Sequence, residues 1–411
     1  MDREQPGDTN CMTSDPSRPP PVPALVLTGG GARAAYQVGV LKALAAALPK
    51  ARNPFPVIVG TSAGAVSAAI LASRAAAWQS AVADIEAVWA GFRVGHVFRV
   101  GARPMLGAGL RWFGSLLTAG LLPAPPSLFD NAPLRALLAR NVHWQGIPDN
   151  IASGDLRAVA LCATGYQNAR SVAFFDGQTS CQTWMRRRHE GRRTTLGLHH
   201  LMSSLALPFL FPAERIEAEF HGDGAMRQFA PLSPAAHLGG NRLLVIGVRE
   251  TSVPPDRAEV PGNSIPRPPG PPDRAVVPAN LAPRPPGPGQ ILGHALDSLF
   301  MDQVQEDLEQ MQRTNLLLRC APETVPGAHP VDTLLMAPSE DPGELAARHL
   351  RSLPRSLAAL LRITGAGGKR GARLASYLMF EGAYTRELIA LGERDANRRR
   401  DELLDFVAPG H

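Results

Sequence analysis

The sequence predicts an α/β protein built around a mostly parallel central sheet. Two strand-then-helix units stand near its start, 24–28 followed by 34–48 and 57–59 followed by 63–77. Short apolar runs that alternate with alanine- and leucine-rich segments indicate βαβ units, in which neighbouring strands run parallel. The run 243–248 is apolar throughout, as is typical of a central strand covered on both faces.

Local residue chemistry sets the boundaries of these elements. The first strand ends in the glycines 29–31, and the helix after it stops at Pro49, whose ring cannot continue a helix. Apolar runs at 157–163, 171–175 and 216–220 predict further strands of the same sheet.

The last third of the chain is expected to be mostly helical. Residues 291–316 space their apolar side chains so that a helix would carry one apolar stripe. Further helices are expected at 344–363 and 384–406, and the short runs 316–318 and 333–336 predict edge strands.

Composition divides the chain into four parts. Residues 1–23 are polar and proline-rich and predict a disordered tail, while 24–250 hold the predicted sheet. Residues 251–289 contain a proline-rich tandem repeat, which predicts a disordered or polyproline-II insertion with docking to a protein partner as one open role. Residues 290–411 are expected to be a helical extension packed on the first domain.

The cysteines and the apolar runs favour a cytoplasmic protein. No uncharged apolar run reaches the roughly 18 residues that a membrane span needs, and residues 1–23 lack the pattern of a secretory signal. Cys11, Cys162, Cys181 and Cys320 are far apart and show no metal-ligand spacing. Because Cys162 and Cys320 lie in apolar runs, both are expected to be buried thiols.

The net charge of +6 is concentrated in local basic runs, 185–193 and 398–400. These runs have two interpretations, a solvated surface or attraction to an anionic surface such as lipid head groups. No nucleic-acid partner is expected, because aromatic residues are 6% of the chain and none alternates with the arginines as a stacking platform. The segment 95–126 mixes apolar residues with glycine and arginine, and is expected to be either core or an apolar lid that contacts lipid.

A glycine-rich loop is the first of three motifs that bear on function. Gly29, Gly30, Gly31 and Arg33 follow a strand and open a helix. Glycines let several backbone N–H groups point into one hollow, which suits a phosphate or a tetrahedral oxyanion. A dinucleotide site would need an acidic residue about 20 positions further on, whereas residues 51–56 contain none. The loop therefore favours an oxyanion.

Ser62 is the second motif, with Gly60 and Gly64 two residues to either side of it. A nucleophile on a tight strand-to-helix turn adopts strained backbone angles and needs small neighbours. The N-terminus of the following helix also places partial positive charge near a developing anion. The pattern predicts a serine nucleophile, and the alternative is a turn that serves packing alone.

Asp223 is the third motif and the candidate general base. In isolation Asp-Gly is typical of a turn, but beside Ser62 it offers a carboxylate for the serine proton. An ordinary Asp, with a pKa near 3.9, must be desolvated and lie within about 2.6–3.2 Å of the serine oxygen to act. The rival is a Ser-Asp-His triad that uses His237 or His294. Neither histidine follows a predicted strand, so the Ser-Asp dyad is favoured.

In this order the motifs resemble those of the patatin-like phospholipases. That family pairs Gly-Gly-Gly-x-Arg/Lys-Gly with Gly-x-Ser-x-Gly and a distant Asp-Gly-Gly/Ala. Carried over by position, the resemblance assigns Gly29, Gly30, Gly31 and Arg33 to an oxyanion hole, Ser62 as nucleophile, Gly60 and Gly64 to its turn, and Asp223 as base.

The extent of the resemblance defines a catalytic domain. It covers about residues 24–250, including flanking segments at 203–209 and 231–234. Residues 290–406 look like the C-terminal extension of one bacterial branch, and Ala34 stands where the family has a glycine.

The resemblance implies a three-layer α/β/α fold and hydrolysis of an acyl ester in a phospholipid, lysophospholipid or related lipid, without a metal or cofactor. The alternative is a catalytically weak or inactive member that binds lipid or regulates another process. The expected location is the cytoplasm, with peripheral contact at the inner membrane surface.

Overall fold

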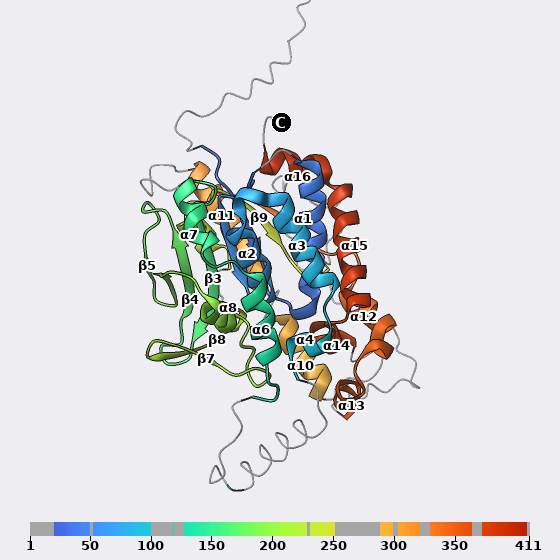
Figure 1. Cartoon of the computed structure of the whole chain (residues 1–411). Helices are drawn as coiled ribbons and strands as arrows, with labels where there is room; N and C mark the ends of the chain where they lie inside the picture. The colour runs from blue at the N-terminus through green and yellow to red at the C-terminus, as the bar shows by residue number, and fades with distance from the viewer. Residues whose placement is uncertain are drawn as a thin grey trace, which may run out of the picture.

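The computed structural model describes residues 20–49, 52–99, 118, 127–227, 231–250, 288–298, 303–320, 329–363 and 372–408. These residues form one mixed sheet with the strand order β10-β9-β1-β2-β3-β4-β6-β5, and β8 joins it by pairing with β3 and β7 (Figure 1). The strands are β1 Pro23–Leu27, β2 Val57–Thr61, β3 Ala158–Gly165, β4 Ser171–Gly177, β5 Trp184–Met185, β6 His189–Arg193, β7 Glu214–Ile216, β8 Glu219–Asp223, β9 Arg242–Ile246 and β10 Asp332–Met336.

Helices flank this sheet, which confirms the predicted α/β/α fold class. They are α1 Ala35–Ala47, α2 Ala63–Ser73, α3 Trp78–Ala90, α4 Val94–Val97, α6 Ala132–Asn141, α7 Gly146–Ser153, α8 Leu198–Ser204, α9 Ser233–His237, α10 Pro288–Asp297, α11 Gln303–Cys320, α12 Pro342–His349, α13 Arg355–Ile363, α14 Ala372–Leu378, α15 Gly382–Arg398 and α16 Arg400–Val407.

Strand direction decides which loops meet. β1 pairs in parallel with β2 and β9, and β2 pairs in parallel with β3. Because the carboxyl ends of parallel strands share one edge of a sheet, the loop after β1 and the turn after β2 lie side by side. The register Leu27 opposite Gly60 places the glycine loop next to Ser62.

Two apolar cores cover the two faces of the sheet. Along β1, Leu25 and Leu27 belong to the core that includes α1, α2, α3 and α15. Ala24 and Val26 point to the opposite face and belong to the core that includes α9 and α11. Adjacent side chains of a strand point to opposite faces, so a strand that is apolar throughout fits a sheet covered on both sides.

The C-terminal residues complete both the sheet and a helix layer. β10 pairs in parallel with β9 at the sheet edge, as predicted for 333–336. α15 packs closely on α1, where a Cβ at Gly39 would lie 1.9 Å from Ile389 O and one at Gly392 would lie 2.1 Å from Tyr36 O. Glycines at this crossing let the two helix backbones approach. The division into domains at residue 250 stays a prediction.

Two predicted strands are wrong. The stretch 216–220 is a hairpin rather than one strand, because the chain turns at Glu217, whose φ is 54°. Asp223 consequently ends β8 instead of following a strand. The run 316–318 continues the helix α11, and Cys320 at its end is exposed rather than buried, whereas Cys162 is buried as expected.

Several long predicted helices are interrupted. The stretch 344–363 divides into α12 and α13 at Pro354, which has no backbone N–H to donate to a helix. The stretch 384–406 divides into α15 and α16 at Arg399, and α2 ends at Ser73 before a separate α3. Within 291–316, α10 ends at Asp297 and α11 begins at Gln303.

Three expectations concern residues outside the described part of the chain. They are the tail at 1–19, most of the segment 95–126, and the proline-rich repeat at 251–287. Among the residues that are described, no helix has the length and apolar character needed to cross a membrane.

Candidate active site

Ser62 lies on a sharp turn between β2 and α2. Its φ of 50° is in the left-handed region, which residues with a side chain rarely adopt. A Cβ at Gly60 would lie 2.6 Å from Ala65 Cα, and a Cβ at Gly64 would lie 2.4 Å from Leu27 O. The two glycines therefore allow the tight turn that presents Ser62 at the N-terminus of α2, where the helix dipole favours negative charge.

Asp223 meets Ser62 directly. Ser62 Oγ donates a hydrogen bond of 2.6 Å to Asp223 Oδ2, although 161 positions separate the two residues in the chain. Strand pairing brings them together: Asp223 on β8 lies opposite Ala163 on β3, and Thr61 on β2 lies opposite Cys162 on β3. Because β4 pairs with the other edge of β3 at these residues, β2 and β8 share one edge of β3, and their carboxyl ends meet there.

Burial sets the acidity of Asp223. Its side chain is fully buried, and the loss of solvation raises the pKa of the carboxyl to about 7 from an ordinary value of 3.8. Hydrogen bonds from Ser62 and from the Ala225 amide, which donates to Oδ1 at 2.9 Å, oppose this shift and are outweighed by it. A carboxylate with a pKa near neutrality is a stronger base than an exposed one.

Ser204 at the end of α8 holds the backbone of the serine turn. The Ser62 amide donates to Ser204 Oγ at 2.9 Å, and Ser204 Oγ donates to Cys162 O at 2.6 Å. Asp223 is fixed in a similar way, since its amide donates to Ala206 O at 2.9 Å. The sequence signal for Ser204 was the resemblance of 203–209 to a flanking segment of the family, which assigned it no role.

The glycine loop places amide groups at the same edge of the sheet. Gly31 has a φ of 55°, and a Cβ there would lie 2.3 Å from Tyr377 O, so only glycine fits. Within the described residues, the amides of Gly30 and Gly31 make no hydrogen bond. A Cβ at Gly64 would also touch Thr28 O, which shows how closely the serine turn packs on this loop. These amides are donors available to an anion.

Arg33 differs from its predicted place in the oxyanion hole. Its backbone N–H donates to Gly30 O at 3.2 Å. Its guanidinium is buried, lies 3.0 Å from Asp297 Oδ1, donates to Ser376 Oγ at 2.7 Å and stacks 3.9 Å from the centre of the Tyr377 ring. Both donor groups of Arg33 are thus occupied, and the residue ties the glycine loop to α10 and α14.

The histidines of the rival triad lie elsewhere. His237 contacts Ser233 within α9, and its ring stacks on Trp184 with 4.7 Å between centres. His294 is exposed on α10. Within the described residues, neither histidine contacts Ser62 or the carboxylate that it meets.

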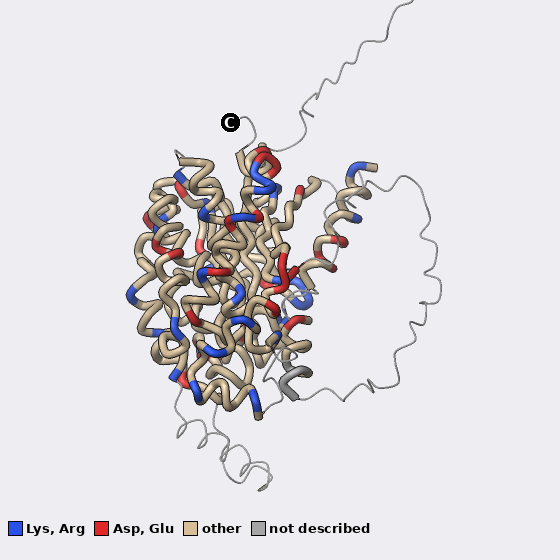
Figure 2. The backbone as a smooth tube through the Cα atoms, turned by 90° about the vertical axis from the view of Figure 1, so that its right-hand side faces the viewer, with Lys and Arg blue, Asp and Glu red and all other residues tan. Residues whose placement is uncertain are grey.

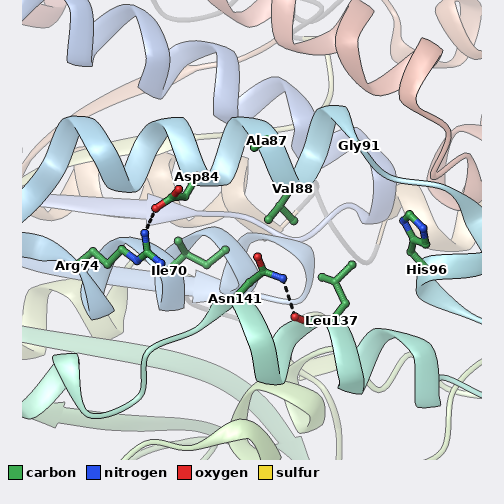
Figure 3. A pocket seen from close by; sticks show the side chains of 9 residues that line it. All are labelled: Ile70, Arg74, Asp84, Ala87, Val88, Gly91, His96, Leu137 and Asn141. Carbon is green, nitrogen blue, oxygen red and sulfur yellow. Dashed lines mark hydrogen bonds and ion pairs between the residues drawn. The ribbon is translucent and has the colours of Figure 1, made fainter.

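A separate pocket of about 310 Å³ lies between α2, α3, α4 and α6 (Figure 3). Ile70, Val88 and Leu137 supply apolar lining, and Arg74 and Asp84 form an ion pair at its side. The lining residue of α2 nearest the serine turn is Ile70, in the second half of the helix. We therefore take the serine turn, and not this pocket, as the candidate active site.

Comparisons with known proteins place the chain in a family. No curated protein matches the sequence. Among solved structures, the chain is similar to human GIVD cytosolic phospholipase A2 in complex with methyl gamma-linolenyl fluorophosphonate, with a TM-score of 0.39 and 14% identity. That alignment covers 94% of this chain and 59% of the human one. The family described as patatin-like phospholipase matches residues 25–236, more than half of the sequence. The chain therefore belongs to the patatin-like phospholipase family.

Proposed function

We propose that this protein is a serine acyl hydrolase that cleaves carboxylic esters of phospholipids, lysophospholipids or related lipids. The observation that carries the proposal is the 2.6 Å hydrogen bond between Ser62 Oγ and the buried Asp223. Three features support it: the strained serine turn, the unoccupied amides of the glycine loop, and membership of the family.

In the first half of the proposed reaction, Ser62 Oγ attacks the ester carbonyl carbon while Asp223 accepts its proton. The carbonyl oxygen becomes an oxyanion, and the amides of Gly29, Gly30 and Gly31 are the proposed donors to it. Collapse of this intermediate breaks the ester C–O bond. Asp223 returns the proton to the departing alcohol oxygen, and the acyl group stays on the serine.

In the second half, water attacks the acyl-enzyme and Asp223 accepts a proton from it. The acyl group leaves as a fatty acid, and Ser62 recovers its proton from Asp223. A carboxyl with a pKa of about 7 suits both directions of transfer, because proton exchange is most efficient when the catalytic pKa lies near the working pH.

The test combines a covalent probe with turnover. We expect a fluorophosphonate probe to label wild-type protein at Ser62, with the site read by peptide mass spectrometry, and p-nitrophenyl butyrate to be hydrolysed. Ser62→Ala should lose both signals. Ser67→Ala is the matched control, because it removes a buried serine hydroxyl in α2, the helix that follows Ser62.

Lipid specificity needs a second measurement. Incubation with a phospholipid extract should release fatty acids with wild-type protein and not with Ser62→Ala. Folded wild-type protein that is neither labelled nor active would contradict the proposal and favour the non-catalytic lipid-binding alternative. A Ser62→Ala protein that hydrolyses the soluble ester at the wild-type rate would rule out Ser62 as the nucleophile.

A further inference from the structure

One stretch of the C-terminal region, from the end of α12 through α13, combines positive charge with exposed apolar surface. Residues 345–363 contain Arg348, Arg351, Arg355 and Arg362 and no Asp or Glu. Arg348 forms an ion pair with Glu387. The positive charge of Arg351, Arg355 and Arg362 gains from contact with a negatively charged surface.

α13, within this stretch, is amphipathic. Leu357 and Leu361 are buried against the core, whereas Arg355 and Arg362 are exposed. Ile363 at the end of the helix is 84% exposed, which places a large apolar side chain in water beside an arginine. Basic helices with apolar residues at their surface are typical of helices that lie at the head-group level of a bilayer.

α13 lies at the same end of the molecule as the β7–β8 hairpin, the lower end in Figure 1. Figure 2 shows Lys and Arg over the whole height of the molecule, this lower end included. The hairpin carries Phe220, which is exposed, and the chain leading into it carries Phe209, which is 70% exposed. The carboxyl end of β2, and with it Ser62, belongs to this end, because Asp223 at the inner end of the hairpin meets Ser62.

The turn between β5 and β6 also lies at this end of the sheet. β6 begins at His189, which lies opposite Ser171, and β4 begins there beside the carboxyl end of β3. The turn itself exposes Met185, Arg186 and Arg187.

Most acidic side chains near this surface are paired with arginine. Glu190 contacts Arg170 and Arg192, Glu219 contacts Arg192, and Glu214 contacts Arg135. Glu217 at the hairpin turn is exposed, and the exposed arginines of α13 and of the β5–β6 turn outnumber it.

The second basic run of the sequence, 398–400, differs from the first in its contacts and in its place in the fold. Arg399 forms an ion pair with Glu402 and donates to Leu335 O, so its charge serves packing. α16, which begins at Arg400, lies at the upper end of Figure 1. The structure therefore separates two basic runs that look alike in the sequence.

We propose that the lower end of the molecule is a docking face for an anionic lipid bilayer. The docking face consists of Arg351, Arg355, Arg362 and Ile363 around α13, together with Met185, Arg186, Arg187, Phe209 and Phe220 on the sheet side. Charge complementarity selects anionic head groups, and the exposed apolar side chains enter the boundary with the acyl chains. The inference rests on the proposed function, because docking by this face would turn the Ser62 edge of the sheet toward lipid esters.

The test measures binding apart from catalysis. Full-length Ser62→Ala protein is sedimented with vesicles of phosphatidylglycerol or of phosphatidylcholine, at low and at physiological ionic strength. We expect binding to phosphatidylglycerol vesicles that weakens with salt, and much weaker binding to phosphatidylcholine. Adding Arg355→Glu and Arg362→Glu should lower the partition coefficient about 30-fold or more, because each arginine near the surface contributes about fivefold.

The matched control changes the same charge elsewhere. Arg313→Glu with Arg400→Glu also removes two exposed arginines, from α11 and α16. It should bind vesicles more tightly than the α13 variant does, and circular dichroism should show all variants folded. Equal binding by the two double variants would overturn the docking face, as would equal binding to both lipids or binding to a DNA duplex in place of vesicles.

A soluble ester separates this inference from the proposed function. In protein that retains Ser62, the double variant Arg355→Glu with Arg362→Glu should hydrolyse p-nitrophenyl butyrate like wild type. It should lose activity on phosphatidylglycerol vesicles. If neither wild type nor the double variant hydrolyses the soluble ester, the proposed function is wrong. The vesicle-binding assay still tests the docking face in that case.

Discussion

The two halves of the candidate site are held by different parts of the chain. The serine turn is held by Ser204, and its partner Asp223 is held by the Ala206 carbonyl, all within the family match at 25–236. The glycine loop is held through Arg33 by Asp297 and by side chains of α14, all beyond that match. The family region therefore contains the proposed reacting groups, while the C-terminal region supports the loop proposed to receive the oxyanion.

The two supports also differ in strength. A neutral hydrogen bond contributes about 0.5–1.5 kcal/mol of net stability, whereas removing one partner of a buried ion pair costs about 3–5 kcal/mol. Asp297 Oδ1 accepts from Arg33 Nη1 at 3.0 Å and from Tyr377 Oη at 2.6 Å, so one carboxylate connects α10, α14 and the loop. Substitutions at Ser204 and at Asp297 should therefore lower kcat and stability to different extents.

The largest expected effect is that of Asp223→Asn, which removes the proposed base of the serine half. A general base contributes about 10²–10⁴ in rate, so kcat on p-nitrophenyl butyrate should fall by about that factor. The melting temperature should hold or rise, because the variant no longer buries an ionisable carboxyl. A variant that retains wild-type kcat would exclude Asp223 as the base.

Asp297→Asn tests the other half and should act first on stability. It leaves the Arg33 guanidinium buried without its counter-charge, so the free energy of unfolding in urea should fall by about 3–5 kcal/mol. We also expect a lower kcat at temperatures where the protein is folded, because the glycine loop loses its anchor. Tyr377→Phe keeps the ring under Arg33 and removes the hydroxyl, which accepts from Arg33 and donates to Asp297. Its stability should lie between those of Asp297→Asn and wild type.

Separate readouts make this second prediction decisive. If Asp297→Asn loses stability while the kcat of the folded protein is unchanged, the loop is held by the family region alone. The proposed division of labour would then be wrong.

The strand, turn and helix around Ser62 could be predicted from the sequence because their signals are local. Gly60, Ser62 and Gly64 lie within one turn, and the strand and helix around them follow from short apolar runs. Asp223 was reached as a candidate, although the hairpin that carries it was not. A hairpin that turns at Glu217 without a glycine or proline leaves little trace in the sequence.

The contacts that support the glycine loop could not be predicted from the sequence. Arg33 was assigned to the oxyanion hole from its place in a motif, but its partners Asp297 and Tyr377 lie 264 and 344 positions away. No periodicity links residues so distant, and only the packing of α10 and α14 on the loop reveals the contact. The role of Ser204 could not be predicted for a similar reason, because a single serine in a helix forms no sequence pattern.

The pH dependence of activity sharpens the account of the serine half. Since the base must be ionised, kcat/KM should fall about tenfold for each pH unit below the Asp223 pKa of about 7 and level off above it. A half-maximal point near pH 4 would mean that Asp223 is solvated during turnover and would contradict its burial.

The same group has the opposite effect on stability. Its folded pKa lies above the unfolded value of about 3.9, so between pH 4 and 7 the folded state holds a proton that the unfolded state releases. The contribution of Asp223 to stability is therefore present at low pH and lost as pH rises to about 7. Asp223→Asn should flatten this part of the urea-stability profile, with wild type as its reference.

The smallest expected effect is that of Ser204→Ala, which leaves the reacting groups intact. It removes the acceptor of the Ser62 amide and the donor to Cys162 O, and each loss affects only the backbone of the turn. A loss of about 1.4 kcal/mol in transition-state stabilisation would lower kcat about tenfold, with little change in KM for a soluble ester. Ser203→Ala is the matched control, because Ser203 Oγ donates to His200 O in the same helix. Equal kcat in the two variants would mean that β2 and α2 fix the serine turn without a contribution from Ser204.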